Sequence, residues 1–231
     1  MTADDQKRAA AIKALDHILP GMRLGLGTGS TAAHFVRALG QRVREGLAVT
    51  AVATSEATAA LAREFGITIV ELNELRHLDL TVDGADELDG SLRLIKGGGG
   101  ALLREKIVAV SSDRMIVIAD ESKLVGELGN FPLPVEIVPF GYRVTMERIA
   151  DAAAAAGCAQ NLITLRGGEK HPFRTDGGNF IADCDCSHIP HPEDLDTRLS
   201  FIPGVVENGL FLDLATVAII GHTGGVKELP A

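Results

Sequence analysis

Short apolar runs alternate with helical stretches over the first half of this chain. We expect strands at residues 22–26, 47–53, 67–70, 78–82, 92–95 and 115–119, and helices at 4–18, from Ser30 to about Glu45, from Thr54 to Phe65, and from Gly100 onward. The run from Met115 to Ala119 is wholly apolar, as strands buried on both faces of a parallel sheet tend to be. This β-α-β order with short links predicts an α/β fold built on a doubly wound, mostly parallel, Rossmann-like sheet.

A proline-marked segment at residues 129–134 separates this pattern from a second one. Beyond it we expect strands at 135–138, 161–165, 179–184 and near Val205, with helices at 142–156 and 192–199. This β-α-β-β-α-β order is that of ferredoxin-like domains. The sequence therefore predicts a Rossmann-like domain at residues 1–129 and 207–231 and a smaller α+β ferredoxin-like domain at 130–206. The apolar stretch 209–220 should rejoin the first sheet, and Gly224 and Gly225 should close a terminal hairpin.

A glycine turn follows the first predicted strand and leads directly into a helix. Residues 25–31 read GLGTGST, so Ser30 stands where the dinucleotide fingerprint GxGxxG has its third glycine, and the GK[ST] of a P-loop is lacking. The hydroxyl groups of Thr28, Ser30 and Thr31 suit a single phosphate or a sugar better than a pyrophosphate. Ser30 or Thr31 can also serve simply as the N-cap of the helix.

The segment 81–107, TVDGADELDGSLRLIKGGGGALLREKI, carries most of the polar chemistry. Asp83 ends a predicted strand, at the edge where open α/β sheets bind ligands. Lys96 precedes four glycines, whose N–H groups can approach an anion closely, and the N-terminus of the next helix adds positive potential. Glu105 lies one turn further on, within reach of such an anion as a base. A flexible glycine hairpin followed by an exposed helical glutamate explains the same spacing equally well.

Charge and composition exclude several classes of function. The net charge is −9, with 22 Lys and Arg against 31 Asp and Glu, whereas binding of a phosphate backbone needs clustered basic side chains. No stretch approaches the roughly 18 apolar residues of a membrane span, and the N-terminal residues have no apolar signal core. Three cysteines give no disulfide framework. We therefore expect a soluble, cytoplasmic protein that binds neither nucleic acid nor membrane.

Two segments of the predicted second domain can suggest function but have simpler explanations. Cys184 and Cys186 lie among acidic residues and histidines, as in some metal sites. Their spacing does not match the CxxC of zinc sites, and residues two apart in a strand share one face, so burial of both thiols without a metal is preferred. The segment RGGEK (166–170) is expected to form a hairpin turn, which can also border a dimer contact.

Six segments together resemble the type A family of ribose-5-phosphate isomerases. They are GLGTGSTAAHFV (25–36), VDGADELDG (82–90), IKGGGGALLREKI (95–107), IADESKLV (118–125), FPLPVEI (131–137) and IPGVVENGLF (202–211). They occur in family order over nearly the whole chain, and the VDGAD and KGGGGAL-x-REK blocks are highly specific together. The resemblance implies reversible aldose–ketose isomerisation of ribose 5-phosphate to ribulose 5-phosphate in the pentose phosphate pathway. It also implies that no metal or organic cofactor is needed and that the protein is a homodimer or a tetramer.

The resemblance assigns roles to particular residues. It implies that Glu105 is the general base, that Asp83 and Asp86 lie near the sugar hydroxyls, and that Lys123 is a cationic substrate contact. Lys7 matches a further contact with phosphate. The remaining substrate contacts that the resemblance implies are Thr28, Gly29, Ser30, Thr31, Gly84, Ala85, Lys96, Gly97, Gly98 and Gly99.

The chemistry of isomerisation agrees with the residues themselves. A proton must leave C2 and return at C1, so one carboxylate can act first as base and then as acid. Partial burial of Glu105 beside Leu102, Leu103 and Ile107 is expected to raise its pKa. Lys96 and the glycine N–H groups can stabilise the enediolate oxygens. Asp83 is our choice for assisting the ring opening that must come first.

Two other functions compete with the isomerase. A non-catalytic sensor of sugar phosphates would explain the binding residues, but the chain has no basic helix-turn-helix segment and carries the full acid–base set. A dinucleotide-dependent oxidoreductase is disfavoured by Ser30 and by the lack of a clear ribose-binding acid after the second strand, where the chain reads AVATSEAT. The isomerase is therefore the preferred prediction.

Overall fold

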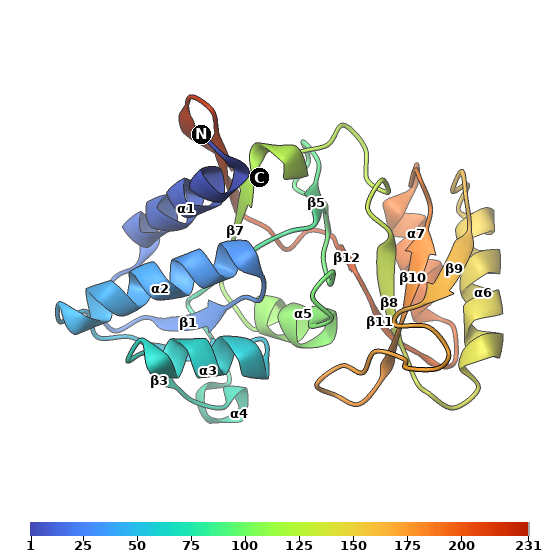
Figure 1. Ribbon diagram of the computed structural model, residues 1–231, viewed down its shortest axis with the longest axis horizontal. Helices are drawn as coiled ribbons and strands as arrows, with labels where there is room; N and C mark the ends of the chain where they lie inside the picture. Colours follow the sequence, from blue (N-terminus) through green and yellow to red (C-terminus); the bar gives the residue numbers. More distant parts are fainter. Residues whose placement is uncertain (231) are drawn as a thin grey trace. The chain divides into compact units, whose positions relative to one another are not determined.

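The computed structural model describes residues 1–230, and the chain divides into two compact units (Figure 1). The first unit contains Met1–Ala85, Arg104–Leu124 and the chain from Asp213 onward, and the second contains Asp86–Leu103 and Val125–Leu212. These units differ from the predicted domains, 1–129 with 207–231 and 130–206, mainly in residues 86–103. The strands of that segment pair within the second unit.

The first unit is built on a seven-stranded sheet with the order β14-β13-β7-β4-β1-β2-β3. Its strands are β1 (Arg23–Leu26), β2 (Thr50–Ala53), β3 (Thr68–Ile69), β4 (Leu80–Asp83), β7 (Met115–Asp120), β13 (Val217–His222) and β14 (Gly225–Pro230). All neighbours are parallel except β13 and β14, which form the predicted terminal hairpin. Without β14 the order is the 3-2-1-4-5-6 of doubly wound dinucleotide-binding folds, so the predicted Rossmann-like sheet is confirmed.

Helices cover both faces of this sheet. They are α1 (Ala3–Ala14), continued by a 3₁₀ turn at Leu15–His17, α2 (Ser30–Arg44), α3 (Glu56–Glu64), α4 (Leu72–Leu75) and α5 (Leu102–Val110). The helices α1, α2 and α3 lie together on one side (Figure 1), where Phe35 packs in one core with Leu24 and Leu26 of β1. Gly25 falls between these leucines and faces the other side, where its Cβ would come 2.5 Å from Val108 of α5.

The second unit contains a four-stranded antiparallel sheet with the order β11-β8-β10-β9. Its elements follow one another as β8 (Leu133–Ile137), α6 (Tyr142–Ala155), β9 (Leu162–Leu165), β10 (Phe180–Asp185), α7 (Pro192–Ser200) and β11 (Val205–Asn208). Apolar residues of both helices, including Ile149 and Leu195, pack in one core with Val135 and Ala182 of the sheet. The predicted β-α-β-β-α-β, ferredoxin-like arrangement is therefore confirmed.

Two short strands lie in a different sheet from the one predicted. The strand β6 (Leu94–Ile95) does not continue the parallel sheet, and β12 (Leu210–Phe211) does not rejoin it. Both belong to a three-stranded antiparallel sheet of the second unit, in the order β12-β6-β5. The strand β5 (Glu87–Leu88) and the helix α4 have no counterpart among the predicted elements. An apolar run indicates that a strand is buried, but tertiary contacts decide which strands it pairs with.

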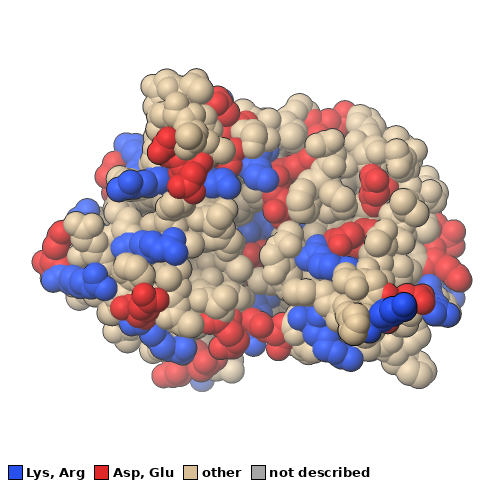
Figure 2. Space-filling model, in the orientation of Figure 1, with Lys and Arg blue, Asp and Glu red and all other residues tan. Residues whose placement is uncertain are grey.

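Within residues 1–230, every helix is too short or too polar to cross a bilayer. On the face drawn in Figure 2, basic and acidic side chains are interspersed, and neither sign forms one continuous field. This mixed surface contrasts with the basic stripe that a nucleic-acid backbone requires.

Gly221 in β13 lies against α1, because its Cβ would come 2.0 Å from the carbonyl oxygen of Gln6. We therefore expect Gly221→Ala to displace the helix from the sheet and to lower the free energy of unfolding by about 3 kcal/mol. For a chain of this length such a loss lowers Tm by roughly 6–12 °C, which circular dichroism can measure. Gly90→Ala is the matched control, since no heavy atom lies within 4 Å of its Cβ position. Equal Tm values for the two variants would contradict this account of α1 packing.

Candidate active site

The carboxyl ends of β1 and β4 lie side by side where the strand order of the first sheet reverses. Asp83, the last residue of β4, is fully buried, and its Oδ1 accepts hydrogen bonds from the N–H of Thr28 at 3.1 Å and of Gly84 at 2.7 Å. A Cβ on Gly27 would come 1.9 Å from the same oxygen. The carboxylate therefore sits directly against the glycine turn, at the position where open α/β sheets bind ligands.

A cluster of hydroxyl groups surrounds Thr28. Its Oγ1 lies 2.7 Å from Thr54 Oγ1, 2.8 Å from Ser55 Oγ and 3.2 Å from Thr58 Oγ1. Thr58 Oγ1 also donates to the carbonyl oxygen of Gly27 at 3.0 Å. These bonds fasten the glycine turn to the segment between β2 and α3. Sequence reasoning missed this cluster, whose signal was the spacing of hydroxyl residues in TSEAT (54–58).

The helix α2 begins at a glycine rather than at a capping side chain. Gly29 is the N-cap residue, with a φ of 118° and no side-chain cap, so the alternative of Ser30 or Thr31 as the N-cap is wrong. Ser30 Oγ instead accepts a hydrogen bond from Lys7 Nζ at 3.2 Å, and this ammonium lies 4.0 Å from Asp120 Oδ2. A helix N-terminus with an ammonium group beside it favours the binding of an anion.

Lys123 and Asp83 both lie at the carboxyl ends of parallel strands of the first sheet. It ends a 3₁₀ turn, Glu121–Lys123, directly after β7. Because β7 runs parallel to β4, with Val117 opposite Asp83, the two strands present their carboxyl ends in the same direction. Gln6 of α1 fixes this turn, since its Nε2 donates to the Glu121 carboxylate at 2.6 Å.

Glu105 lies on the buried side of α5 and is only 3% exposed. Val108 and Ala109, which are neighbours one turn away, are also buried, whereas Ile107 is 43% exposed. The expectation that Ile107 helps to bury Glu105 is therefore wrong, because positions two apart on a helix point to different faces. The burial of Glu105 also excludes the alternative of an exposed helical glutamate.

Lys96 follows β6 in the second unit and is 2% exposed. Its N–H donates to the carbonyl oxygen of Gly209 at 2.9 Å, and its Nζ lies 5.3 Å from the centroid of the Phe211 ring. Glycine is needed at position 209, where a Cβ would come 2.4 Å from the carbonyl oxygen of Lys96. The ammonium is thus held near an aromatic ring, away from bulk water, where a positive charge acts strongly on an anion.

The glycine loop, residues 97–100, is closely packed. Gly97 and Gly100 have φ values of 100° and 82°, which residues with a side chain rarely adopt. A Cβ on Gly98 would come 2.6 Å from Asp86 Oδ1, and the N–H of Gly98 donates to Asp86 Oδ2 at 2.7 Å. A side chain at position 98 would therefore displace the Asp86 carboxylate, which the structure brings onto the loop.

Arg166 lies far from the glycine loop in the sequence but contacts it in the structure. Its Nη1 donates to the carbonyl oxygens of Gly97 at 3.0 Å and Gly98 at 3.1 Å. From the sequence, residues 166–170 are expected to form a hairpin turn that can also border a dimer contact. No local pattern could have found the contact, because the partners lie 69 and 68 positions apart.

The cysteines of the second unit belong to its core. Cys184 and Cys186 are buried, as predicted, with their Sγ atoms 3.4 Å apart. A hydrogen bond to Cys186, together with burial, raises the pKa of the Cys158 thiol above its ordinary value. Protonated thiols in such surroundings are poor nucleophiles and poor metal ligands.

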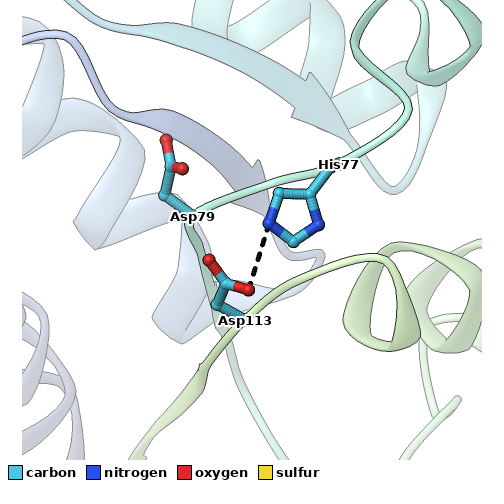
Figure 3. A group of neighbouring side chains, drawn as sticks. All are labelled: His77, Asp79 and Asp113. Atoms are coloured by element: carbon cyan, nitrogen blue, oxygen red, sulfur yellow. Dashed lines mark ion pairs between the residues drawn. The ribbon is translucent and has the colours of Figure 1, made fainter.

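A second group of titratable side chains lies at the opposite edge of the first sheet (Figure 3). His77 and Asp79 precede β4, and Asp113 precedes β7; His77 Nε2 lies 3.1 Å from Asp113 Oδ1. Arg23 donates to Asp79 from its N–H at 2.7 Å and from Nη2 at 2.6 Å. These bonds lower the pKa of the Asp79 carboxyl. Because Arg23 already compensates the charge of Asp79, this group is best explained as ion pairs between strand ends.

A family model for ribose 5-phosphate isomerase A (phosphoriboisomerase A) matches residues 50–225 of the chain. The chain is 58% identical to a ribose-5-phosphate isomerase A from Parvibaculum lavamentivorans over 231 residues, which covers 100% of each chain. It is 55% identical to one from Rhodopseudomonas palustris, strain BisB18, over 227 residues, which covers 98% of each chain.

Solved structures of such isomerases are also similar. A D-ribose-5-phosphate isomerase in complex with phospho-erythronic acid has a TM-score of 0.93 and 39% identity, with 100% of both chains covered. Ribose 5-phosphate isomerase A from Methanocaldococcus jannaschii has a TM-score of 0.91 and 40% identity, also with 100% of both chains covered. The enzyme from Neisseria gonorrhoeae has a TM-score of 0.89 and 40% identity, covering 99% of this chain and 97% of its own.

The Arg23–Asp79 pair is expected to stabilise the first unit in a pH-dependent way. Because the pKa of Asp79 is lowered by folding, its contribution is fully present above the unfolded value of about 3.9 and is lost as the pH falls through the folded value. Both side chains are partly exposed, so Asp79→Asn should lower the free energy of unfolding by only about 1 kcal/mol at pH 7, and by less at pH 3.

Urea unfolding at the two pH values measures this difference. Asp113→Asn is the matched control, since Asp113 and its partner His77 are both exposed and the change should have little effect at pH 7. A loss for Asp79→Asn that is the same at both pH values would contradict the assignment.

Proposed function

The chain belongs to the ribose 5-phosphate isomerase A family, and we propose that it interconverts D-ribose 5-phosphate and D-ribulose 5-phosphate by proton transfer through an enediolate. This is an aldose–ketose isomerisation of the pentose phosphate pathway. The observation that carries the proposal is the buried carboxylate of Glu105, on the helix that follows Lys96 and the glycine loop. One short segment of the chain thus offers a base and donors for an anion.

Glu105 is assigned as the group that moves the proton. Isomerisation takes a proton from C2 of the open sugar and returns one at C1, on the neighbouring carbon. A single carboxylate can perform both transfers if it is held in one place, first as the base and then as the acid. The burial of Glu105 on α5 favours this role, because a side chain shielded from bulk water exchanges its proton with solvent slowly, so that part of the abstracted proton is returned to the sugar.

Lys96 and the glycine loop are assigned to the enediolate. Removal of the C2 proton places negative charge on the sugar oxygens, so donors aimed at those oxygens lower the barrier by on the order of 3 kcal/mol each. Lys96 is buried, which strengthens its interaction with a developing anion. The N–H groups of Gly97 and Gly99 are the accompanying backbone donors in this assignment, and Gly98, whose N–H is bonded to Asp86 Oδ2, contacts the substrate through that carboxylate.

Asp83 is assigned to ring opening and Asp86 to orientation of the sugar hydroxyls. The furanose must open first, because only the open form has the carbonyl group that makes the C2 proton acidic. Two backbone N–H groups bind Asp83 Oδ1 and so fix the direction of the carboxylate. Gly84 and Ala85 lie between the two aspartates, are partly exposed, and are assigned as backbone contacts with the substrate.

The phosphate is assigned to the N-terminus of α2. Gly29 leaves the first N–H groups of this helix without a side-chain cap, and Ser30 and Thr31 add hydroxyl groups there. Lys7 already donates to Ser30 and is assigned as a cationic contact with the phosphate. Lys123 is assigned as a second cationic contact with the substrate, and Thr28 as the residue that shapes the turn.

Phospho-erythronic acid, the ligand of one similar isomerase, is a useful probe of these assignments. It carries a phosphate group and, at the other end, a carboxylate whose two oxygens resemble those of the enediolate. Compounds that resemble a high-energy intermediate bind more tightly than the substrate when the site is complementary to that intermediate. We therefore propose that this chain also binds phospho-erythronic acid, in competition with ribose 5-phosphate.

A cytoplasmic homodimer or tetramer is proposed as the working assembly. The three cysteines are free thiols, as in reducing compartments. Large apolar side chains of the second unit are exposed, including Phe140 at 92% and Phe201 at 83%, and such surface is typical of contacts between chains. Sedimentation velocity gives the assembly state directly.

Proton NMR of ribose 5-phosphate with the purified, metal-free protein in D2O tests the proposed function. We expect ribulose 5-phosphate to appear with deuterium at C1, and ribose 5-phosphate re-formed from it to carry deuterium at C2, because the proton carried by the base exchanges with solvent in part of the turnovers. Binding of ribose 5-phosphate without conversion or exchange would instead identify a sensor of sugar phosphates. Neither binding nor exchange would contradict the proposal altogether.

Glu105→Gln tests the base. We expect kcat to fall by on the order of 10³-fold, because the amide cannot accept the proton, while KM stays within about threefold. A coupled assay of ribulose 5-phosphate formation measures both constants. Glu64→Gln, an exposed glutamate at the end of α3, is the matched control and should keep full activity. If Glu105→Gln retains more than a few per cent of kcat, another group is the base.

A further inference from the structure

We propose that Arg166 is a positioning residue for the isomerisation: it holds two peptide groups of the glycine loop in the orientation that turns the N–H of Gly99 toward the substrate and the N–H of Gly98 toward Asp86. The inference rests on the proposed function, since it concerns the same loop. Arg166 itself has no assigned contact with the substrate, and it acts through the backbone of Gly97 and Gly98.

The guanidinium of Arg166 uses its two edges for two different partners. Nη1 donates to the carbonyl oxygens of Gly97 and Gly98, at 3.0 and 3.1 Å. Nε donates to Asp183 Oδ2 at 2.9 Å, and Nη2 donates to the other oxygen of the same carboxylate. The carboxylate balances the charge and fixes the plane of the guanidinium, so that Nη1 is aimed at the loop.

Two of the residues that hold Arg166, Ile181 and Asp183, lie on β10 of the antiparallel sheet of the second unit. The N–H of Arg166 donates to Ile181 of β10 at 2.9 Å, and its carbonyl oxygen accepts the N–H of Phe173 at 2.8 Å. Asp183 lies on β10 as well. The side chains of Arg166 and Asp183 are only 18% and 24% exposed, so water competes weakly for their hydrogen bonds. Arg166 is itself the first residue of the turn after β9, and β10 fixes its backbone and its guanidinium.

The orientation of the loop amides follows from the geometry of the peptide bond. In a planar trans peptide the C=O and the N–H point in opposite directions. The carbonyl oxygens of Gly97 and Gly98 face Arg166, so the N–H groups of Gly98 and Gly99 point away from it. The N–H of Gly98 indeed reaches Asp86 Oδ2, at 2.7 Å, on the other side of the loop. Asp86 and Arg166 thus hold the same peptide unit from its two sides.

The loop needs such an anchor because glycine does not hold its own conformation. A glycine peptide can rotate into several backbone regions at little cost, and Gly97 already has a φ of 100°. A rotated peptide would present a carbonyl oxygen, in place of an N–H group, to the enediolate. Repulsion would then replace stabilisation in the step where the donors matter most.

Lysine cannot replace arginine in this arrangement. A guanidinium is a planar fork that can bind a carboxylate with one edge and carbonyl oxygens with another, whereas an ammonium is a compact point charge on a flexible stem. Arg166→Lys therefore keeps the positive charge beside Asp183 but cannot bind the carboxylate and the two carbonyl oxygens at the same time. That makes it the informative variant, since it is far less disruptive than removal of a half-buried charge.

The experiment compares Arg166→Lys with Arg174→Lys. Arg174 is a matched control because its Nη1 also donates to a glycine carbonyl oxygen, that of Gly178 at 2.9 Å. Its guanidinium lies over the Phe180 ring, as that of Arg166 lies over the Phe173 ring. We expect kcat of Arg166→Lys to fall by roughly 10- to 100-fold, with KM for ribose 5-phosphate within about threefold. The inhibition constant of phospho-erythronic acid should rise by about the same factor as kcat falls. Arg174→Lys should match the unchanged protein in all three constants.

A second variant separates positioning from a general loss of structure. Arg166→Ala leaves a space that a guanidinium ion can enter, so about 50 mM guanidinium chloride should restore part of kcat. The Tm of the variant should not rise, because this salt does not stabilise folded proteins. Restored kcat with unrestored Tm supports positioning. No restoration, or a kcat of Arg166→Lys equal to that of Arg174→Lys, overturns the inference. Failure of the proposed function is distinguishable, because the unchanged protein would then show no conversion in the same assay.

Discussion

The first unit depends on one close approach of backbone and side chain, at the carboxyl ends of β1 and β4. Only glycine at position 27 leaves room for the Asp83 carboxylate, which lies 1.9 Å from where a Cβ would stand. The same carboxylate orders the turn by accepting the N–H of Thr28, and the hydroxyl groups of Thr54 and Thr58 complete the arrangement. The reversal of strand order opens a space at this edge, and this contact places an acid in it.

The second unit also contains a glycine segment, and hydrogen bonds from side chains restrain its backbone. In the proposed function its glycine loop brings backbone N–H groups close to a ligand. The φ of 100° at position 97 and the close packing at positions 97 and 98 both favour glycine. The same freedom would let the peptides rotate. Asp86 and Arg166 restrain them from opposite sides, through one N–H and two carbonyl oxygens. Donors held in place before the reaction cost no reorganisation when charge develops, which is why such restraint benefits catalysis.

Much of the fold could be predicted, because the pattern of apolar residues indicates which side chains are buried. Burial of these side chains is what packs the elements together. The wholly apolar run at Met115–Ala119 predicted a central parallel strand, and β7 is buried throughout. Prediction failed for Leu94–Ile95 and Leu210–Phe211, which are apolar for the same reason but pair in another sheet. A strand of two residues has too few side chains to specify its partner, so the surrounding core decides the pairing.

The sequence by itself determined the chemistry available to this protein. Asp83, Lys96 and Glu105 stand in or beside glycine-rich turns at the ends of predicted elements, and those local patterns sufficed to propose a base, a cation and a set of backbone donors. Only the tertiary structure decided that Thr54 and Thr58 brace the first turn and that Arg166 anchors the glycine loop. Arg166 lies 69 positions from Gly97, and its neighbours in the chain are those of an ordinary turn. Local sequence encodes backbone preference and burial, whereas a hydrogen bond between distant residues exists only once the whole chain has brought them together.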